Sequence, residues 1–325
     1  MSHYRTALPQ LGHELFLTDG GLETTLVFLD RMELPCFAAF DLLRRPEGVQ
    51  RLWDYYRSYA DLARRWGVGL ILESPTWRAN PDWGQRLGCD ARKLAELNQA
   101  SVALMAQVRS EFESAGGRAV VSGCVGPRGD GYVLQQAMSV DEAAAYHSEQ
   151  VAALADSPAD LVTAATMTSS AEAAGVARAT ARFNIPVVLS FTVETDGRLP
   201  SGETLRSAIE TVDELTAGAP AYYMVNCAHP EHFGPVLEPG SAWTGRLRGL
   251  RANASRRSHA ELDSATDLDR GEPAAWAEAQ AQLLRNMPHV TVLGGCCGTD
   301  QEHVAALIAA CHSLFPGQPG SLSTG

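Results

Sequence analysis

The chain has 325 residues, 45% of them hydrophobic and 20% charged, which is typical of a globular protein rather than a disordered or fibrous one. Its 26 basic and 38 acidic residues give a formal net charge of −12, which disfavours nucleic acid and anionic membranes as partners. No apolar run is long enough to predict a membrane span, and the start lacks a signal-peptide pattern. We therefore expect a cytoplasmic protein.

Short apolar runs alternate with longer amphipathic stretches along the chain. In the first long stretch, Leu52, Tyr56 and Tyr59 recur at helical spacing, and Gly67 ends it. The runs predict strands, in chain order, at residues 15–18, 70–72, 119–121, 161–165, 186–191, 222–226, 247–250 and 290–293. The stretches predict helices at 46–66, 91–114, 140–155, 170–183, 203–216, 230–233, 273–285 and 300–314.

Eight strand–helix units in about 300 residues predict an α/β fold, a single (β/α)8 TIM barrel. The alternative is an open doubly wound sheet with six or seven strands. We expect one barrel domain over residues 1–315 and a flexible tail over 316–325, which is rich in Gly, Pro and Ser. The polar stretch 251–272 is predicted to be a long loop after the seventh strand.

The seven cysteines are odd in number and irregularly spaced, which favours metal binding, catalysis or burial over a disulfide scaffold. Cys227 and the pair Cys296–Cys297 follow the sixth and eighth predicted strands. Because the carboxyl ends of barrel strands share one mouth, the three thiols are expected to meet there. Three thiolates and one open position suit Zn²⁺ and would hold an incoming thiol as a thiolate. Inert buried cysteines or a closed structural zinc are the alternatives.

Other polar residues follow predicted strands at the same end. Asp19, Gly20 and Gly21 could bind the ammonium and carboxylate of a small ligand, although a tight turn explains them equally well. Glu73 needs a cationic partner, either a ligand amine or a nearby Arg. Asn226 is expected to fill a backbone hydrogen bond beside Cys227.

Three further residues have a structural and a functional interpretation. His229 follows Cys227 by two positions, but a solvated loop histidine is expected more often than a metal ligand. Trp77 and Trp83 could form a wall for a methyl-bearing cation through cation–π contact, although aromatic residues more often simply pack.

Five motifs, taken together and in order, resemble the homocysteine S-methyltransferases, zinc-dependent (β/α)8 barrels that move a methyl group onto a thiol. The motifs are LTDGGLET at 17–24, ESPTWRAN at 73–80, GP at 126–127, VNCAHP at 225–230 and GGCCGT at 294–299. The resemblance implies Cys227, Cys296 and Cys297 as catalytic zinc ligands. It implies substrate binding by Asp19, Gly20 and Gly21 and around Ser74 and Thr76.

The sequence departs from the family pattern at two places. The family carries Glu-Thr at the end of strand four, where the Glu holds the substrate ammonium, but here Ala165 stands at that position. Glu73 could supply the missing charge from strand two. The loop over residues 126–132 is shorter than the corresponding loop of the family, which helps to shape the side of the site where the methyl donor binds. The identity of the donor is therefore left open.

We expect a zinc-dependent methyltransferase that moves a methyl group from a sulfonium or ammonium donor to a thiol such as homocysteine, as in methionine biosynthesis. S-methylmethionine and S-adenosylmethionine are the favoured donors, and no other partner than these small molecules is indicated. Two alternatives stay open. One is a thiol redox enzyme that uses Cys296 and Cys297, and the other is a non-catalytic barrel that binds a thiol.

Overall fold

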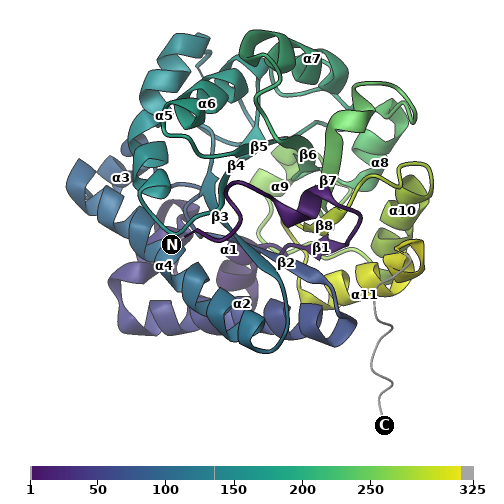
Figure 1. Ribbon diagram of the computed structural model, residues 1–325, viewed down its shortest axis with the longest axis horizontal. Coiled ribbons are helices and arrows are strands. Elements are labelled where there is room, and N and C mark those ends of the chain that lie inside the picture. Colours follow the sequence, from purple (N-terminus) through teal and green to yellow (C-terminus); the bar gives the residue numbers. More distant parts are fainter. Residues whose placement is uncertain (1, 135, 316–325) are drawn as a thin grey trace.

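The computed structural model describes residues 2–134 and 136–315. Eight parallel strands form a closed barrel in sequence order, with β1 paired to both β2 and β8 (Figure 1). This confirms the predicted (β/α)8 barrel over the open sheet. The strands are β1 (Phe16–Leu17), β2 (Gly69–Glu73), β3 (Ala119–Val125), β4 (Leu161–Met167), β5 (Val187–Phe191), β6 (Tyr222–Asn226), β7 (Leu247–Ala252) and β8 (Val292–Gly295).

Helices surround the barrel, as Figure 1 shows. They are α1 (Leu22–Thr24), α2 (Pro46–Trp66), α3 (Pro81–Arg86), α4 (Ala91–Ser114), α5 (Val140–Ala155), α6 (Ser170–Arg182), α7 (Leu205–Thr216), α8 (Pro230–Phe233), α9 (His259–Asp263), α10 (Pro273–Arg285) and α11 (Gln301–Cys311). A π-helical turn over Thr25–Leu29 continues α1, and short 3-10 turns lie at Pro9–Leu11, Pro35–Phe37, Ala39–Arg44, Gly234–Val236, Thr244–Arg246 and His312–Leu314. No helix in the described part of the chain is long and apolar enough to cross a membrane.

Local sequence signals explain why several helices have the predicted bounds. Helix α2 begins with Pro46, whose fixed φ suits the first helical position, and ends at Gly67 with φ of 65°. Asp90 caps the first turn of α4, and Ser139 forms a capping box with Glu142 at the start of α5.

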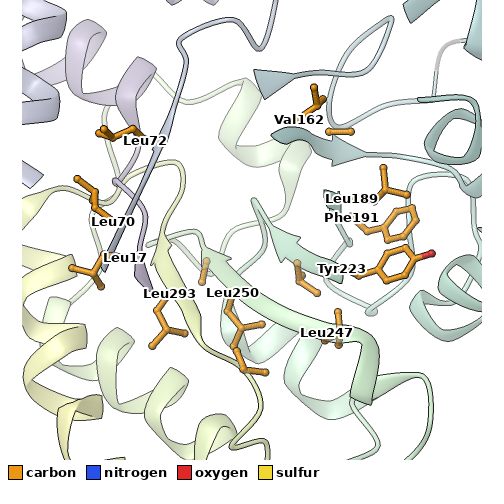
Figure 2. Close-up of a cluster of buried hydrophobic side chains, with 14 of the residues drawn as sticks. Leu17, Leu70, Leu72, Val162, Leu189, Phe191, Tyr223, Leu247, Leu250 and Leu293 are labelled. Atoms are coloured by element: carbon orange, nitrogen blue, oxygen red, sulfur yellow. The ribbon is translucent and has the colours of Figure 1, made fainter. Parts of the chain in front are cut away.

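Two apolar layers hold the barrel together. Outward-facing side chains of the strands, among them Leu17, Leu70 and Leu250, pack under the helices in the large core cluster (Figure 2). Inward-facing side chains form a second cluster that includes Phe16 and Tyr222. The barrel is therefore a packed core, which leaves the chemistry to the loops at its ends.

The N-terminal segment closes the end of the barrel where the strands begin. The backbone N–H groups of His3 and Tyr4 donate to one carboxylate oxygen of Asp160 at 2.6 and 2.8 Å. The other oxygen accepts from Arg109 and from the N–H of Val121, both at 2.9 Å. Asp160 is fully buried directly before β4, so its charge is matched by four donors at this closed end.

The stretch 251–272 is not the single long loop that its polarity predicted. Strand β7 continues to Ala252, and the short helix α9 lies within the remainder. Arg251 consequently belongs to β7 and not to the loop, and it is buried inside the barrel mouth. Its charge is tolerated there because two carboxylates lie against it. The predicted tail, 316–325, falls outside the described residues.

Candidate active site

A cavity of about 430 Å³ opens at the carboxyl ends of the strands. Most of the residues predicted to form a site line it. They are Asp19, Gly20, Gly21, Glu73, Ser74, Asn226, Cys227, Cys296 and Cys297. Thr76 is fully buried beside the cavity rather than among its lining residues. The barrel topology therefore brings together side chains that lie far apart in the sequence.

The three cysteines form one cluster in this cavity. Cys227 follows β6, whereas Cys296 and Cys297 follow β8, and their Sγ atoms all lie within 4.8 Å of one another. Cys227 and Cys296 are joined as a disulfide with a Cα–Cα distance of 5.3 Å, and Cys297 is a free thiol. The bonded pair is thus not the neighbouring pair that the redox interpretation named. In the reduced form the cluster offers three sulfur ligands to a metal ion.

Strained backbone and a buried amide position the cysteine loop. Cys227 has a φ of 53° and Thr166 a φ of 61°, conformations that non-glycine residues rarely adopt. The Asn226 side chain accepts from the Thr166 N–H at 2.9 Å and donates to its hydroxyl at 2.8 Å. The Asn226 Nδ2 atom also lies 3.9 Å from the Cys296 Sγ. Asn226 therefore fills a backbone hydrogen bond, as predicted, and also contacts the cluster.

Tyr132 and His259 contact the cysteine residues of the cluster, and no sequence motif pointed to either. The Tyr132 hydroxyl donates to the Cys297 Sγ at 3.4 Å, and its ring stacks on His259 with centroids 3.9 Å apart. The His259 Nε2 atom lies 2.8 Å from the Cys227 carbonyl oxygen. Burial raises the pKa of Tyr132 well above its ordinary value, so the phenol stays protonated and remains a donor.

Arg251 is the cationic partner that Glu73 required. One Arg251 nitrogen donates to Asp19 at 2.6 Å, another contacts Glu73, and Nε donates to the Gly295 carbonyl at 3.2 Å. Burial raises the pKa of Asp19 to about 6, although Arg251 opposes the rise. Both carboxylates predicted to bind a substrate ammonium are therefore already paired within the protein.

The other predicted binding groups also have internal partners. The Ser74 hydroxyl accepts from the N–H of Cys124 at 3.0 Å, and the Thr76 hydroxyl donates to the carbonyl of Cys124 at 2.6 Å. The N–H of Gly21 donates to Thr299 at 3.0 Å. A Cβ atom on Gly21 would lie 2.6 Å from the Cys296 carbonyl oxygen, so the second glycine allows close packing on the cysteine loop.

Trp77 lies over the strand-four position that departs from the family pattern. Its indole N–H donates to the carbonyl of Ala165 at 3.3 Å. The guanidinium of Arg78 lies 5.0 Å from the Trp77 ring centroid and 4.1 Å from that of Trp83. Arg86 lies 4.4 Å from the Trp83 ring centroid as well. Two of the protein's own cations thus contact Trp83, which matches the packing interpretation of that residue.

His229 differs from its sequence-based expectation, and Glu23 is a cavity residue that the sequence analysis did not select. His229 is buried and caps α8 by accepting from the Glu231 N–H at 3.2 Å, and it is not among the clustered metal ligands. Burial lowers the pKa of His229 to about 4, so the ring stays neutral. Glu23, on α1, lines the cavity, and burial raises its pKa to about 7. An acidic residue in the first turn of a helix looks ordinary in a sequence, which is why the pattern did not select Glu23.

A closed (β/α)8 barrel with a cysteine cluster at its carboxyl-end mouth defines a class of enzymes that act at that mouth. The family model "Homocysteine S-methyltransferase" matches residues 16–311 of the chain. The chain therefore belongs to the homocysteine S-methyltransferase family and is an enzyme of the methyltransferase class.

Individual proteins show the same similarity. The homocysteine S-methyltransferase of Escherichia coli is 27% identical, with 91% of this chain and 95% of the relative covered. A second relative, homocysteine S-methyltransferase YbgG of Bacillus subtilis, is 24% identical over 93% and 96% of the two chains. The metallated crystal form of the E. coli homocysteine methyltransferase MmuM matches at 25% identity with a TM-score of 0.69, over 91% and 96%. Its oxidized form matches at 24% identity with a TM-score of 0.73, over 94% and 99%.

Proposed function

We propose that this protein is a zinc-dependent S-methyltransferase that methylates a thiol such as homocysteine, the step that yields methionine. Zinc is the metal in this proposal, and Cys227, Cys296 and Cys297 are its ligands. The observation that carries the proposal is the placement of three sulfur atoms within 4.8 Å of one another in the cavity of a methyltransferase barrel.

The donor set fits zinc better than a hard cation. Three thiolates and no carboxylate make up the cluster, and sulfur ligands select zinc over magnesium or calcium. A zinc ion held in this way would supply a Lewis acid that keeps an incoming thiol deprotonated near neutral pH. Because the cysteines must be reduced to bind metal, the proposal also favours a reducing compartment such as the cytoplasm.

The residues around the cluster give the cavity a fixed shape in which two reactants can meet. The Asn226 amide is held by Thr166, whose hydroxyl lies 3.9 Å from the Cys227 Sγ, and Arg251 holds Asp19 and Glu73 inside the mouth. When the acceptor thiol and the methyl donor bind side by side in such a cavity, their effective concentration relative to each other rises. Asp19, Gly20, Gly21, Ser74 and Thr76 shape the acceptor side, mainly through their contacts with one another and with the cysteine loop.

Charge supports a cationic donor. Seven carboxylate residues and two arginines line the cavity, a formal balance of 2 − 7 = −5. This field attracts a sulfonium such as S-methylmethionine or S-adenosylmethionine. The acceptor sulfur bonds to the methyl carbon as the sulfonium S–C bond breaks. The donor then leaves as a neutral thioether, and the acceptor thiol proton passes to solvent.

Metal analysis combined with a methylation assay tests the proposal. Reduced wild-type protein should hold about one zinc per chain and methylate homocysteine, whereas Cys227→Ser should lose most of both. Cys36→Ser is the matched control, since Cys36 is a free cysteine outside the cluster. Reduced protein that binds no zinc, or Cys227→Ser protein that keeps zinc and activity, would contradict the proposal.

One observation favours a second candidate, a thiol redox or thiol-binding protein. Cys227 and Cys296 are bonded to each other, and a reversible disulfide is what a redox site requires. The same experiment separates the two functions. A redox protein would cycle this disulfide without metal and would transfer no methyl group from any sulfonium offered.

A further inference from the structure

The first turn of α1 is packed directly on the cysteine loop. Gly298 donates its N–H to the Thr24 hydroxyl at 3.1 Å, and Gly21 donates to the carbonyl of Thr299 at 3.0 Å. Gly21 is also close enough to Cys296 that a Cβ atom there would clash with the Cys296 carbonyl. Glu23 lies between these two anchors and lines the same cavity as the three cysteines. Its carboxylate is therefore carried on a turn whose position relative to Cys297 is fixed.

Most carboxylates of the inner cavity have a cation beside them. Arg251 pairs with Asp19 and Glu73, and Arg78 lies 3.7 Å from Asp130. These carboxylates have little capacity left for a further positive charge.

Glu23 differs from these carboxylates in its surroundings. Within residues 2–134 and 136–315, Glu23 takes part in no ion pair. Asp263 and Asp267 have no ion pair there either, but both are exposed at the cavity mouth, where water solvates them. Asp269, also at the mouth, accepts from Ser255 at 2.6 Å and lies 3.6 Å from Arg257. Glu23 is thus the half-buried carboxylate of the described cavity that lacks a cation.

We infer that Glu23, on α1, is the residue that binds the ammonium group of the acceptor thiol. This inference rests on the proposed methyltransferase function. A carboxylate withdrawn from water is costly unless a cation or donor group compensates it. An ammonium group that enters with the substrate would compensate Glu23, and it would do so only when the acceptor is bound.

Two further observations agree with this role. Burial raises the pKa of Glu23 to about 7, although its own backbone N–H and the more distant Arg251 and Arg78 oppose the rise. Ala165, which lines the same cavity, has no charge, and the Trp77 indole N–H donates to its carbonyl. Strand β4 therefore contributes no carboxylate here, and Glu23 on α1 supplies the negative charge instead.

Isothermal titration calorimetry on the reduced, zinc-loaded protein tests the inference without any methyl donor. Homocysteine is compared with 4-sulfanylbutanoate, which has the same thiol and carboxylate but no amine. Wild-type protein should bind homocysteine about tenfold to a hundredfold more tightly, the range expected for a charge-assisted hydrogen bond. Glu23→Gln should remove most of this preference and leave the affinity for 4-sulfanylbutanoate within about threefold of wild type.

A matched variant controls for the loss of one negative charge. Glu47 also lies in the first turn of a helix, α2, but it is exposed and outside the cavity. Glu47→Gln should keep the wild-type preference for homocysteine, and zinc content should be equal in all three proteins.

The outcomes separate the inference from the function on which it rests. A homocysteine preference that survives in Glu23→Gln, or a wild-type protein that binds both thiols equally, would overturn the inference and leave the methyltransferase intact. Wild-type protein that binds zinc but neither thiol would overturn the proposed function, and the inference with it.

Discussion

The indole N–H of Trp77 donates to the backbone carbonyl of Ala165 at 3.3 Å. This contact places a large aromatic ring beside the end of β4, where the homocysteine S-methyltransferase pattern has a glutamate. A Cβ atom on Gly131 would lie 2.8 Å from the same ring and 3.0 Å from Thr166, so the ring is packed closely on this wall. The Trp77 ring is thus packed against the backbone of the position where the family pattern has a glutamate.

Restoring the glutamate should harm the protein rather than repair it. Ala165 is 6% exposed, so Ala165→Glu would force a longer, charged side chain against the packed Trp77 wall. We expect the free energy of unfolding to fall by about 1–3 kcal/mol. Urea unfolding followed by circular dichroism measures this, with Ala165→Ser as the small-residue control. An Ala165→Glu protein as stable as wild type would show that this wall has room for the family's residue.

Replacing Arg251 alone should lower the free energy of unfolding more than replacing Arg251 together with the two carboxylates that it contacts. Arg251→Met leaves the carboxylates of Asp19 and Glu73 close together in a buried site. We expect a loss of about 3–5 kcal/mol in the free energy of unfolding, the range for breaking a buried ion pair on one side.

A triple variant checks that explanation. Arg251→Met combined with Asp19→Asn and Glu73→Gln should recover part of the lost stability, because no unpaired charge then remains. Urea unfolding at one pH is sufficient for the comparison. A triple variant less stable than Arg251→Met would mean that Arg251 acts mainly through packing and its contact with Gly295.

The pH dependence of stability should reveal the charge at the start of α11. Asp300 caps this helix, and His303 lies 2.8 Å from its carboxylate, with Arg270 also in contact. Burial alone would raise the pKa of Asp300, but these partners hold it at about 2, below the ordinary 3.8. The folded protein therefore binds this proton less readily than the unfolded chain, so the stabilisation is present above pH 4 and is lost as the pH falls toward 2.

Asp300→Asn isolates that effect because asparagine also caps helices well. Wild type should be more stable by about 2 kcal/mol near neutral pH, and the difference should narrow between about pH 5 and pH 3. Urea unfolding at several pH values gives the curve. Asp263→Asn, at an exposed position, serves as control. A difference that stays constant over this range would assign the effect to capping geometry and not to charge.

The sequence predicted those parts of the fold and site that depend on local pattern. Helix α2 follows from its apolar spacing, Pro46 and Gly67, and the cysteine cluster follows from three thiols placed after strands of one barrel. The chemistry of Cys227 and Cys296 could be proposed because residue type and strand ends are both visible in a sequence.

Pairings across the barrel could not be predicted in the same way. Arg251 stands at the start of a polar stretch and is separated from Glu73 by 178 residues. Only the closure of the barrel brings the two together, and their pairing is what makes burial of Arg251 possible. The sequence also could not show that the Glu23 carboxylate has no ion-pair partner among the described residues. That depends on which neighbouring cations are already paired with other carboxylates, and those pairs form only in the folded barrel.

The two ends of strand β4 differ in how many contacts depend on their side chains. At the closed end, Asp160 is held by four donors from the N-terminal segment, Arg109 and Val121, and a change there would disturb all of them. At the mouth, the Ala165 side chain is a methyl group that makes no hydrogen bond or ion pair. Evolution can therefore alter the substrate preference at one end of this strand while the other end preserves the architecture. A change from glutamate to alanine at the mouth therefore leaves the hydrogen bonds at the closed end of the strand intact.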